Sequence, residues 1–319
     1  MTHPLDPYRG PEQREALLDE LARQAGGEVA VLGASVEGRP LRAARVPASG
    51  EAEGRVLCTA NIHGPELIAA ELALSLLRGL GQIGAPARQL RRRAEVWVIP
   101  CLNPDGYART WEAGGQGSLR ELRTNANGVD LNRNFPLPTS ARSSGDRWEG
   151  TVDLPWAGSS RPGSPNYRGP SPLSEPEAAA LDRLLRQQRF RASVNLHSFM
   201  GAVIPARVTD SQDYAAYRGL ARRFRLAQSE HRYRRLASRW FDIFTGELED
   251  HQHHALGCWA VCVELMTIGF SLRQHLRAPS LFWRFNPHDS RPWIDNDLPA
   301  VVAYLDAALD LPPPAVTAP

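Results

Sequence analysis

Four short, mostly apolar runs separated by longer segments of helical composition are the feature that most constrains the fold of this chain. Each run has the length of a β-strand, and such runs are typical of strands covered on both faces of a sheet. The runs cover residues 55–63, 95–102, 191–197 and 258–265. Strands that alternate with helices form layered domains. The pattern therefore predicts an α/β/α sandwich with a mixed, mostly parallel central sheet flanked by helices.

The segments between these runs supply the expected helices and two further strands. The predicted helices cover 11–25, 66–80, 174–188, 211–231 and 297–309, and the short strands cover 29–33 and 40–46. Ser174 is the expected N-cap of its helix, and Glu177, three residues later, completes a capping box.

Two long segments, 136–170 and 270–296, are rich in turn-forming or aromatic residues. Segments of this length inside a compact domain are usually functional, so we expect both to be surface loops at the rim of a site. The sequence contains no internal repeat. We therefore predict one catalytic domain over residues 1–319, with its core in residues 28–310.

The composition argues against two classes of partner. The formal net charge is only +2 at pH 7, so we expect neither a nucleic acid nor a membrane surface as partner. No apolar run approaches the length of a membrane span. The N-terminal residues lack the basic start and apolar stretch of a secretory signal. We therefore expect a cytoplasmic protein.

The four cysteines lie inside or at the end of the predicted strands. They are Cys58, Cys101, Cys258 and Cys262. This placement favours buried free thiols over a disulfide framework or a metal site. Cys258 and Cys262 would share one face of a strand but lie too far apart to form a disulfide easily.

Polar side chains stand at the ends of the apolar runs. His63 ends the first run, Asn103 and Asp105 follow the second, His197 ends the third, and Glu264 lies near the end of the fourth. Binding sites in open α/β sheets form beyond the carboxyl ends of the strands. These side chains are therefore the candidates for a functional site.

Three of the candidate residues have the chemistry of a metal site. His63 and Glu66 are three residues apart at a strand-to-helix junction, and His197 adds a second imidazole. Two imidazoles and a carboxylate suit zinc and leave a fourth position for water. The alternative interpretation is that Glu66 caps a helix, His63 is incidental and His197 is a hydrogen-bonded structural residue.

Glu264 is a carboxylate inside an apolar strand, where an unpaired charge is costly to bury. One interpretation is a structural ion pair with one of the many arginines. The other is a general base with a raised pKa beside a metal-bound water. The three metal-ligand candidates favour the second interpretation.

The segment RTNANGVDLNRNFP at 123–136, together with NPDG at 103–106, resembles the zinc carboxypeptidase family. This family includes pancreatic carboxypeptidases and bacterial murein-peptide amidases, and the motif style is closest to the amidases. Further matches occur in the family's order and extend the resemblance over roughly residues 30–265. They are GASVEGRPL at 33–41, NIHGPE at 61–66, YRGPSPLSEPEAAAL at 167–181, VNLHSF at 194–199 and VCVEL at 261–265.

The resemblance implies one zinc ion bound by His63, Glu66 and His197. It further implies that Glu264 takes a proton from the zinc-bound water and returns it to the leaving amine. Arg123 matches the arginine that stabilises the oxyanion of the tetrahedral intermediate.

The resemblance also implies a binding site for the substrate's terminal carboxylate. Asn132 and Arg133 match the pair that holds this group, and the planar guanidinium of Arg133 suits bidentate binding. The alternative interpretation of Arg123, Asn132 and Arg133 is loop structure around a turn at Asn127-Gly128.

Two departures from the family pattern bear on the substrate pocket. Gly64 and Pro65 stand where pancreatic members carry an arginine. The segment 236–250 also lacks the tyrosine of the family's mobile loop, and Tyr233 lies too early to replace it. Trp240, Phe241 or Phe244 are the candidates to cover the site instead.

The segment that precedes the last apolar run is acidic and rich in histidine. Glu247, Glu249 and Asp250 would favour a basic or amine-bearing side chain if one of them faces the site, and a solvated loop is the alternative. We interpret the cluster of His251, His253 and His254 as part of an exposed loop rather than as a second metal site.

These features predict a metallopeptidase that hydrolyses an amide bond next to a free carboxylate. It would be a carboxypeptidase or a small-peptide amidase, and its partner would be a peptide or small amide substrate. An N-acyl amino acid deacylase of the aspartoacylase type is the alternative on the same scaffold. A non-catalytic zinc-binding module is the third possibility, against which the presence of Glu264 argues.

Overall fold

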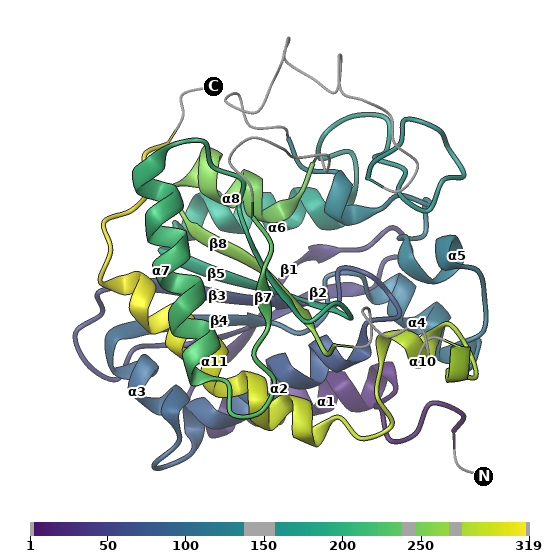
Figure 1. The fold of residues 1–319 in the computed structure, drawn as a ribbon. Helices are drawn as coiled ribbons and strands as arrows, with labels where there is room; N and C mark the ends of the chain where they lie inside the picture. The colour runs from purple at the N-terminus through teal and green to yellow at the C-terminus, as the bar shows by residue number, and fades with distance from the viewer. Residues whose placement is uncertain (1–2, 137–156, 238–245, 268–275, 317–319) are drawn as a thin grey trace.

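The computed structural model describes residues 3–136, 157–237, 246–267 and 276–316, and an eight-stranded sheet forms its centre (Figure 1). The strand order is β1-β2-β4-β3-β5-β8-β6-β7. The strands are β1 (Glu28–Ala34), β2 (Pro40–Val46), β3 (Gly54–Ala60), β4 (Ala94–Ile99), β5 (Ala192–Ser198), β6 (Ala202–Pro205), β7 (Arg234–Arg235) and β8 (Trp259–Leu265).

The four central strands, β4, β3, β5 and β8, run parallel to one another. β1 and β2 add an antiparallel pair at one side, and β6 joins β8 in the antiparallel direction at the other. The predicted mixed sheet with flanking helices is therefore confirmed.

Helices cover both faces of the sheet (Figure 1). One face carries α1 (Pro11–Gln24), α2 (Leu67–Gly81), α3 (Pro86–Arg93), α7 (Ser211–Ala227) and α11 (Arg291–Leu309), and the other carries α6 (Pro176–Gln188) and α8 (Leu248–Leu256). Because successive side chains of a strand point to opposite faces, Val56 and Cys58 pack in one core and Leu57 in the other. Burial on both faces explains why the central strands have no alternation of polar residues.

Three short helices were not predicted from the sequence. They are α4 (Pro104–Glu112), α5 (Leu119–Arg123) and α10 (Phe282–Phe285). Asn103 begins α4 by accepting a hydrogen bond from the Gly106 amide at 2.8 Å, and Ser118 with Glu121 forms a capping box for α5.

The capping box predicted at Ser174 is wrong. Helix α6 begins at Pro176 with Glu175 as its N-cap. The Ser174 hydroxyl does not cap the helix and donates to the Glu175 carboxylate at 2.8 Å. The Glu177 carboxylate instead accepts hydrogen bonds from the Val36 amide and from the Asn125 side chain. Pro176 has no amide proton to donate, which suits the first turn of a helix.

Several predicted boundaries also move. Strand β3 ends at Ala60 because Asn61 turns the chain with a φ of 52°. Helix α7 ends at Ala227, and α11 begins at Arg291 rather than at residue 297. The segment 270–296 is therefore not one loop, since α10 and the start of α11 lie within it. Of the other predicted loop, residues 137–156 lie outside the described residues.

All four cysteines are free and buried, as predicted. Among the described residues no single helix is long and apolar enough to cross a membrane. By length and composition α2 and α3 pass this test only as a pair, and they are bent by 73° relative to each other.

Candidate metal centre

The turn between β3 and α2 brings His63 and Glu66 together. The Asn61 side-chain amide donates to the carbonyl oxygens of His63 and Gly64, which closes the turn. Gly64 is required there, because a Cβ atom would lie 2.4 Å from the Leu122 carbonyl oxygen and 2.5 Å from that of Gly106.

The far end of the chain holds the same turn in place. The side chain of Asn286, which is fully buried, donates to the Pro65 carbonyl at 2.6 Å and accepts from the Ile68 amide at 2.9 Å. Ile68 lies in the first turn of α2, two residues after Glu66. The position of Glu66 is thus fixed from both sides.

The three predicted metal ligands converge, and all three are buried. Nδ1 of His63 lies 2.8 Å from Oε1 of Glu66, and Nδ1 of His197 lies 3.2 Å from Oε2. Potential ligand atoms of the three residues all lie within 4.8 Å of one another. Two imidazole nitrogens and a carboxylate are a ligand set typical of catalytic zinc.

Two further observations show that a zinc ion fits this cluster. Oε2 of Glu66 is buried and faces Nδ1 of His197 at 3.2 Å, so both atoms could bind one cation. Nε2 of His63 faces Oδ1 of Asp130 at 3.1 Å, which directs Nδ1 of the same ring toward Glu66. A carboxylate behind a histidine is the usual arrangement around metal-ligating imidazoles.

The electrostatics of the cluster keep its carboxylate ionised. Burial opposes ionisation of Glu66, but the rings of His63 and His197 outweigh it and lower the Glu66 pKa to about 2. Burial lowers the pKa of His197, which favours the neutral ring that a metal ligand must have. For His63, burial and Arg123 oppose protonation, while Glu66 and Asp130 raise its pKa.

Asp130 connects the metal ligands to the segment that follows, and the sequence analysis assigned it no role. Its Oδ1 faces His63 and also accepts from the Asn132 amide at 3.1 Å, while Oδ2 accepts from Nε of Arg123 at 2.9 Å. Burial opposes its ionisation, but Arg123 and His63 hold its pKa below the usual range. Its position as the first residue of the DLNRNF segment, just ahead of Asn132 and Arg133, could have indicated a role in the site.

Glu264 lies next to the metal ligands on the neighbouring strand. In the parallel pair of β5 and β8 it stands directly beside His197. Its Oε2 atom is buried without a hydrogen-bond partner, and no arginine among the described residues forms an ion pair with it. Burial, reinforced by the Glu66 carboxylate, raises the pKa of Glu264 to about 7. Cys262, two residues earlier, could also place a ligand atom near His197 and Glu264.

Arg123 and Arg133 are held at different depths beside this centre. Arg123 is the last residue of α5 and is bound to Asp130. Burial opposes its charge, but Asp130, together with Glu66 and Glu264, raises its pKa. Arg133 is buried in a short 3-10 helix, where Nε donates to the Ala157 carbonyl at 2.6 Å. Its Nη1 lies 3.3 Å from Glu247. Both guanidinium groups are fixed by hydrogen bonds.

Asn132 and Glu247 join this region to the start of α8. Oδ1 of Asn132 accepts from the Leu248 amide at 2.9 Å, and Glu247 is the N-cap of the helix. The acidic segment is therefore not a solvated loop, because Glu249 and Asp250 are buried in α8. Asp250 accepts from the Arg207 amide at 2.7 Å.

The interpretation of the histidine cluster as an exposed loop is wrong. His251, His253 and His254 are buried on α8, and each has its own partner. His251 is bonded to Asp182 at 2.7 Å, His253 to the Tyr217 hydroxyl at 2.9 Å and His254 to the Arg207 carbonyl at 2.7 Å. Because the three rings bind different partners, they do not form a common metal site.

The missing tyrosine is not supplied by Tyr233. That side chain is buried, and its hydroxyl donates to Asp297 on α11. The three candidates to replace the tyrosine, Trp240, Phe241 and Phe244, lie outside the described residues.

Comparison with known proteins places this site in a family. The zinc carboxypeptidase family matches residues 15–279. The carboxypeptidase N catalytic chain of Rattus norvegicus is 32% identical over 187 residues, which are 54% of this chain and 37% of the rat protein. The chain thus spans about a third of the length of that curated relative.

Solved structures of related proteins share the fold. Carboxypeptidase A from Helicoverpa armigera superimposes with a TM-score of 0.70 at 19% identity, over 94% of this chain and 74% of that one. The murein-tripeptide amidase MpaA from Escherichia coli O157 has a TM-score of 0.52 at 23% identity, over 87% and 91%. These comparisons give the deacylase alternative no support.

The chain belongs to the zinc carboxypeptidase family. The name of this family states the ion that the cluster of His63, Glu66 and His197 fits by its ligand chemistry.

Proposed function

We propose that the protein is a zinc-dependent peptidase that hydrolyses an amide bond next to a free carboxylate, as a carboxypeptidase or a small-peptide amidase. One observation carries this proposal: the carboxylate of Glu264, whose Oε2 atom is buried without a hydrogen-bond partner, lies directly beside a converged cluster of two imidazoles and a carboxylate. A purely structural cluster would not need an acid without an ion-pair partner at its edge.

His63, Glu66 and His197 would hold the zinc ion. When bound, zinc supplies a Lewis acid that polarises a carbonyl group and lowers the pKa of a water molecule toward 7. Asp130 orients the His63 ring through Nε2, so that Nδ1 faces Glu66 and would be free to bind the ion.

Glu264 acts as general base and then as general acid. Its pKa of about 7 lets it accept a proton from the attacking water near neutral pH and return it to the leaving amine. Arg123 stabilises the negative charge that develops on the carbonyl oxygen, because Asp130 fixes its guanidinium before substrate binds. Such a preorganised donor stabilises the transition state more than the ground state.

Arg133 and Asn132 bind the terminal carboxylate of the substrate. Both are buried beside Asp130 in the same short helix, so their distance from the metal ligands is fixed by the backbone. The substrate is accordingly a peptide or small amide with a free carboxylate. A cytoplasmic location, the absence of nucleic-acid and membrane partners and a single catalytic domain stay predictions.

The test combines metal removal with one substitution. Treatment with phenanthroline should abolish peptide hydrolysis, and added zinc should restore it. Glu264→Gln should retain zinc but lower kcat about 100- to 10,000-fold, because the group that moves the proton is lost. Glu112→Gln makes the same chemical change at an exposed helical position and should leave kcat unchanged. Normal turnover by Glu264→Gln, or activity indifferent to the chelator, would contradict the proposal.

A further inference from the structure

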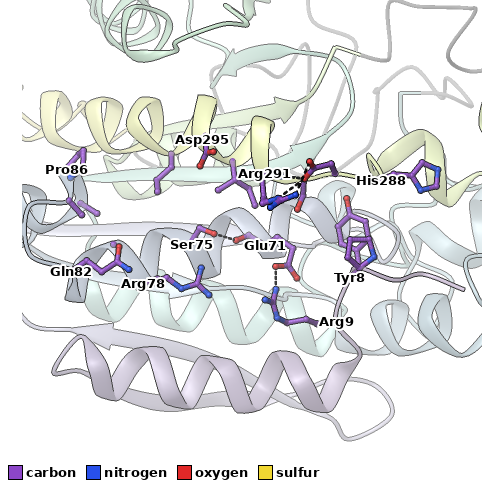
Figure 2. Close-up of a pocket in the computed structure, with 18 residues that line it drawn as sticks. Tyr8, Arg9, Glu71, Ser75, Arg78, Gln82, Pro86, His288, Arg291 and Asp295 are labelled. Carbon is purple, nitrogen blue, oxygen red and sulfur yellow. Dashed lines mark hydrogen bonds and ion pairs between the residues drawn. The ribbon is translucent and has the colours of Figure 1, made fainter. Parts of the chain in front are cut away.

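A cavity of about 570 Å³ lies between α2 and α11 (Figure 2). Its walls come from α2, from the N-terminal segment 7–9, from the start of α3, and from residues 288–298. None of the seven candidate residues of the metal centre lines it. The cavity is therefore separate from the proposed catalytic site.

The α2 wall carries surplus positive charge. Arg9 forms an ion pair with Glu71, while Arg78 has no hydrogen bond or ion pair with any described residue. Figure 2 shows the Arg78 guanidinium directed toward the Arg9–Glu71 pair. Two guanidinium groups thus face one carboxylate on this side, and Arg78 is half-buried, where an unpaired charge is costly.

The opposite wall carries surplus negative charge. Arg291 is bonded to Asp289 through Nε at 3.2 Å. Asp295, one turn further along α11, has no hydrogen bond or ion pair with any described residue. Two carboxylates thus face one guanidinium on the α11 side.

Apolar side chains line the cavity between the two charged walls. Ala85 and Ala87 contribute from the α2–α3 junction, and Ile294 and Leu298 contribute from α11. Pockets that bind small molecules usually measure about 300–1,000 Å³. A cavity of 570 Å³ can therefore hold a molecule of amino-acid size.

We propose that this cavity binds a zwitterionic α-amino acid or short peptide with an apolar side chain. Its carboxylate binds Arg78, because a guanidinium offers paired donors to a carboxylate. Its ammonium group faces Asp295, and its side chain lies against Ile294 and Leu298. Each charge of the ligand neutralises a charge that the protein leaves unpaired.

The test measures binding of L-leucine by isothermal titration calorimetry and saturation-transfer NMR. L-Leucinamide lacks the carboxylate and N-acetyl-L-leucine lacks the ammonium group, so both should bind more weakly than leucine. Arg78→Gln should weaken leucine binding at least about tenfold, the usual effect of losing a charge-assisted hydrogen bond. Asp295→Asn should weaken it less, since Asp295 is exposed.

Two controls separate this cavity from the proposed catalytic site. Arg92→Gln removes an exposed arginine of α3 that does not line the cavity, and it should leave binding unchanged. Arg133→Lys weakens any binding of leucine at the proposed catalytic site, where Arg133 would hold its carboxylate; the binding that Arg78→Gln removes should persist in Arg133→Lys. Leucine binding that survives Arg78→Gln but is lost in Arg133→Lys would overturn the proposal, as would no binding or equal binding of all three compounds. None of these measurements requires turnover, so they do not depend on the proposed hydrolysis.

Discussion

Asp130 is the side chain through which three candidate functions meet. It orients a proposed zinc ligand, fixes the proposed oxyanion donor and accepts from the backbone of the proposed carboxylate-binding segment. It contacts neither the scissile bond nor the terminal carboxylate in the mechanism proposed above. It is therefore a positioning residue.

Asp130→Asn should lower the affinity for zinc about 10- to 100-fold, because an amide orients the His63 ring less strongly than a carboxylate. The measurement is a competition titration with a chromophoric chelator, with circular dichroism to confirm folding. Asp19→Asn, at an exposed position of α1, serves as the matched control. Unchanged zinc affinity in Asp130→Asn would refute the positioning role.

Arg133→Lys tests the carboxylate-binding site while keeping the positive charge. The lysine loses the bidentate geometry, so KM should rise about tenfold for substrates with a free terminal carboxylate. KM for the matching amidated substrates should change little. An equal rise for both substrate types would exclude carboxylate binding by Arg133.

At the scale of secondary-structure elements, the turn between β3 and α2 has little steric freedom. A methyl group at Gly64 would meet two backbone carbonyl oxygens, and neither can move without shifting α4 or α5. Gly64→Ala should therefore lower the free energy of unfolding by about 1–3 kcal/mol and weaken zinc binding.

Gly219→Ala provides the matched control for this substitution. Gly219 is exposed on α7, and a Cβ atom there would meet nothing within 4 Å. The same change should raise the stability by about 0.5–1 kcal/mol, since alanine is the better helix former. Urea unfolding of both variants should give opposite signs. A destabilisation of equal size in both would show that the turn is not special.

At the same scale, the sequence predicts elements well where the pattern is local. The strands β3, β4, β5 and β8 follow from apolar runs, and their polar ends indicated His63, His197 and Glu264 as site residues. Helix α8 could not be predicted in this way. Its histidines look solvent-exposed because their partners, such as Asp182 and Tyr217, are far away in the sequence.

The geometry of the candidate site likewise depends on contacts that no local pattern contains. The neighbouring positions of His197 and Glu264 come from the register of two parallel strands. The link from Asp130 to His63 spans 67 residues. Residue types and motif resemblance therefore gave the candidates, and only the fold shows how their atoms are oriented.

The whole molecule contains a pH-dependent contribution to stability at Asp297 of α11. Burial raises the pKa of this carboxyl to about 6, although Tyr233, Gln228 and Asn296 donate hydrogen bonds to it. The folded state therefore holds the proton more tightly than the unfolded chain. The resulting stabilisation is fully present below pH 3.8, the ordinary pKa of the group, and is lost as the pH rises through 6. The loss of unfolding free energy over this range amounts to about 3 kcal/mol.

Asp297→Asn should remove this dependence, because the amide does not ionise. Between pH 4 and pH 7 the wild-type protein should lose up to about 3 kcal/mol of unfolding free energy that the variant keeps. The difference in unfolding free energy, variant minus wild type, should rise by this amount. Urea unfolding at several pH values measures the difference. Parallel stability curves for the two proteins would contradict the assignment.

The hydrogen bonds from Asn286 to the turn at Pro65 and Ile68 also have a consequence during synthesis. They join residues 221 and 218 positions apart in the chain. At translation rates of about 5–20 residues per second, the ribosome makes His63 and Glu66 roughly 10–40 s before Asn286. The nascent chain therefore carries two of the proposed metal ligands well before the hydrogen bonds from Asn286 that hold their turn can form. We expect stable metal capture to follow, rather than accompany, the completion of the polypeptide.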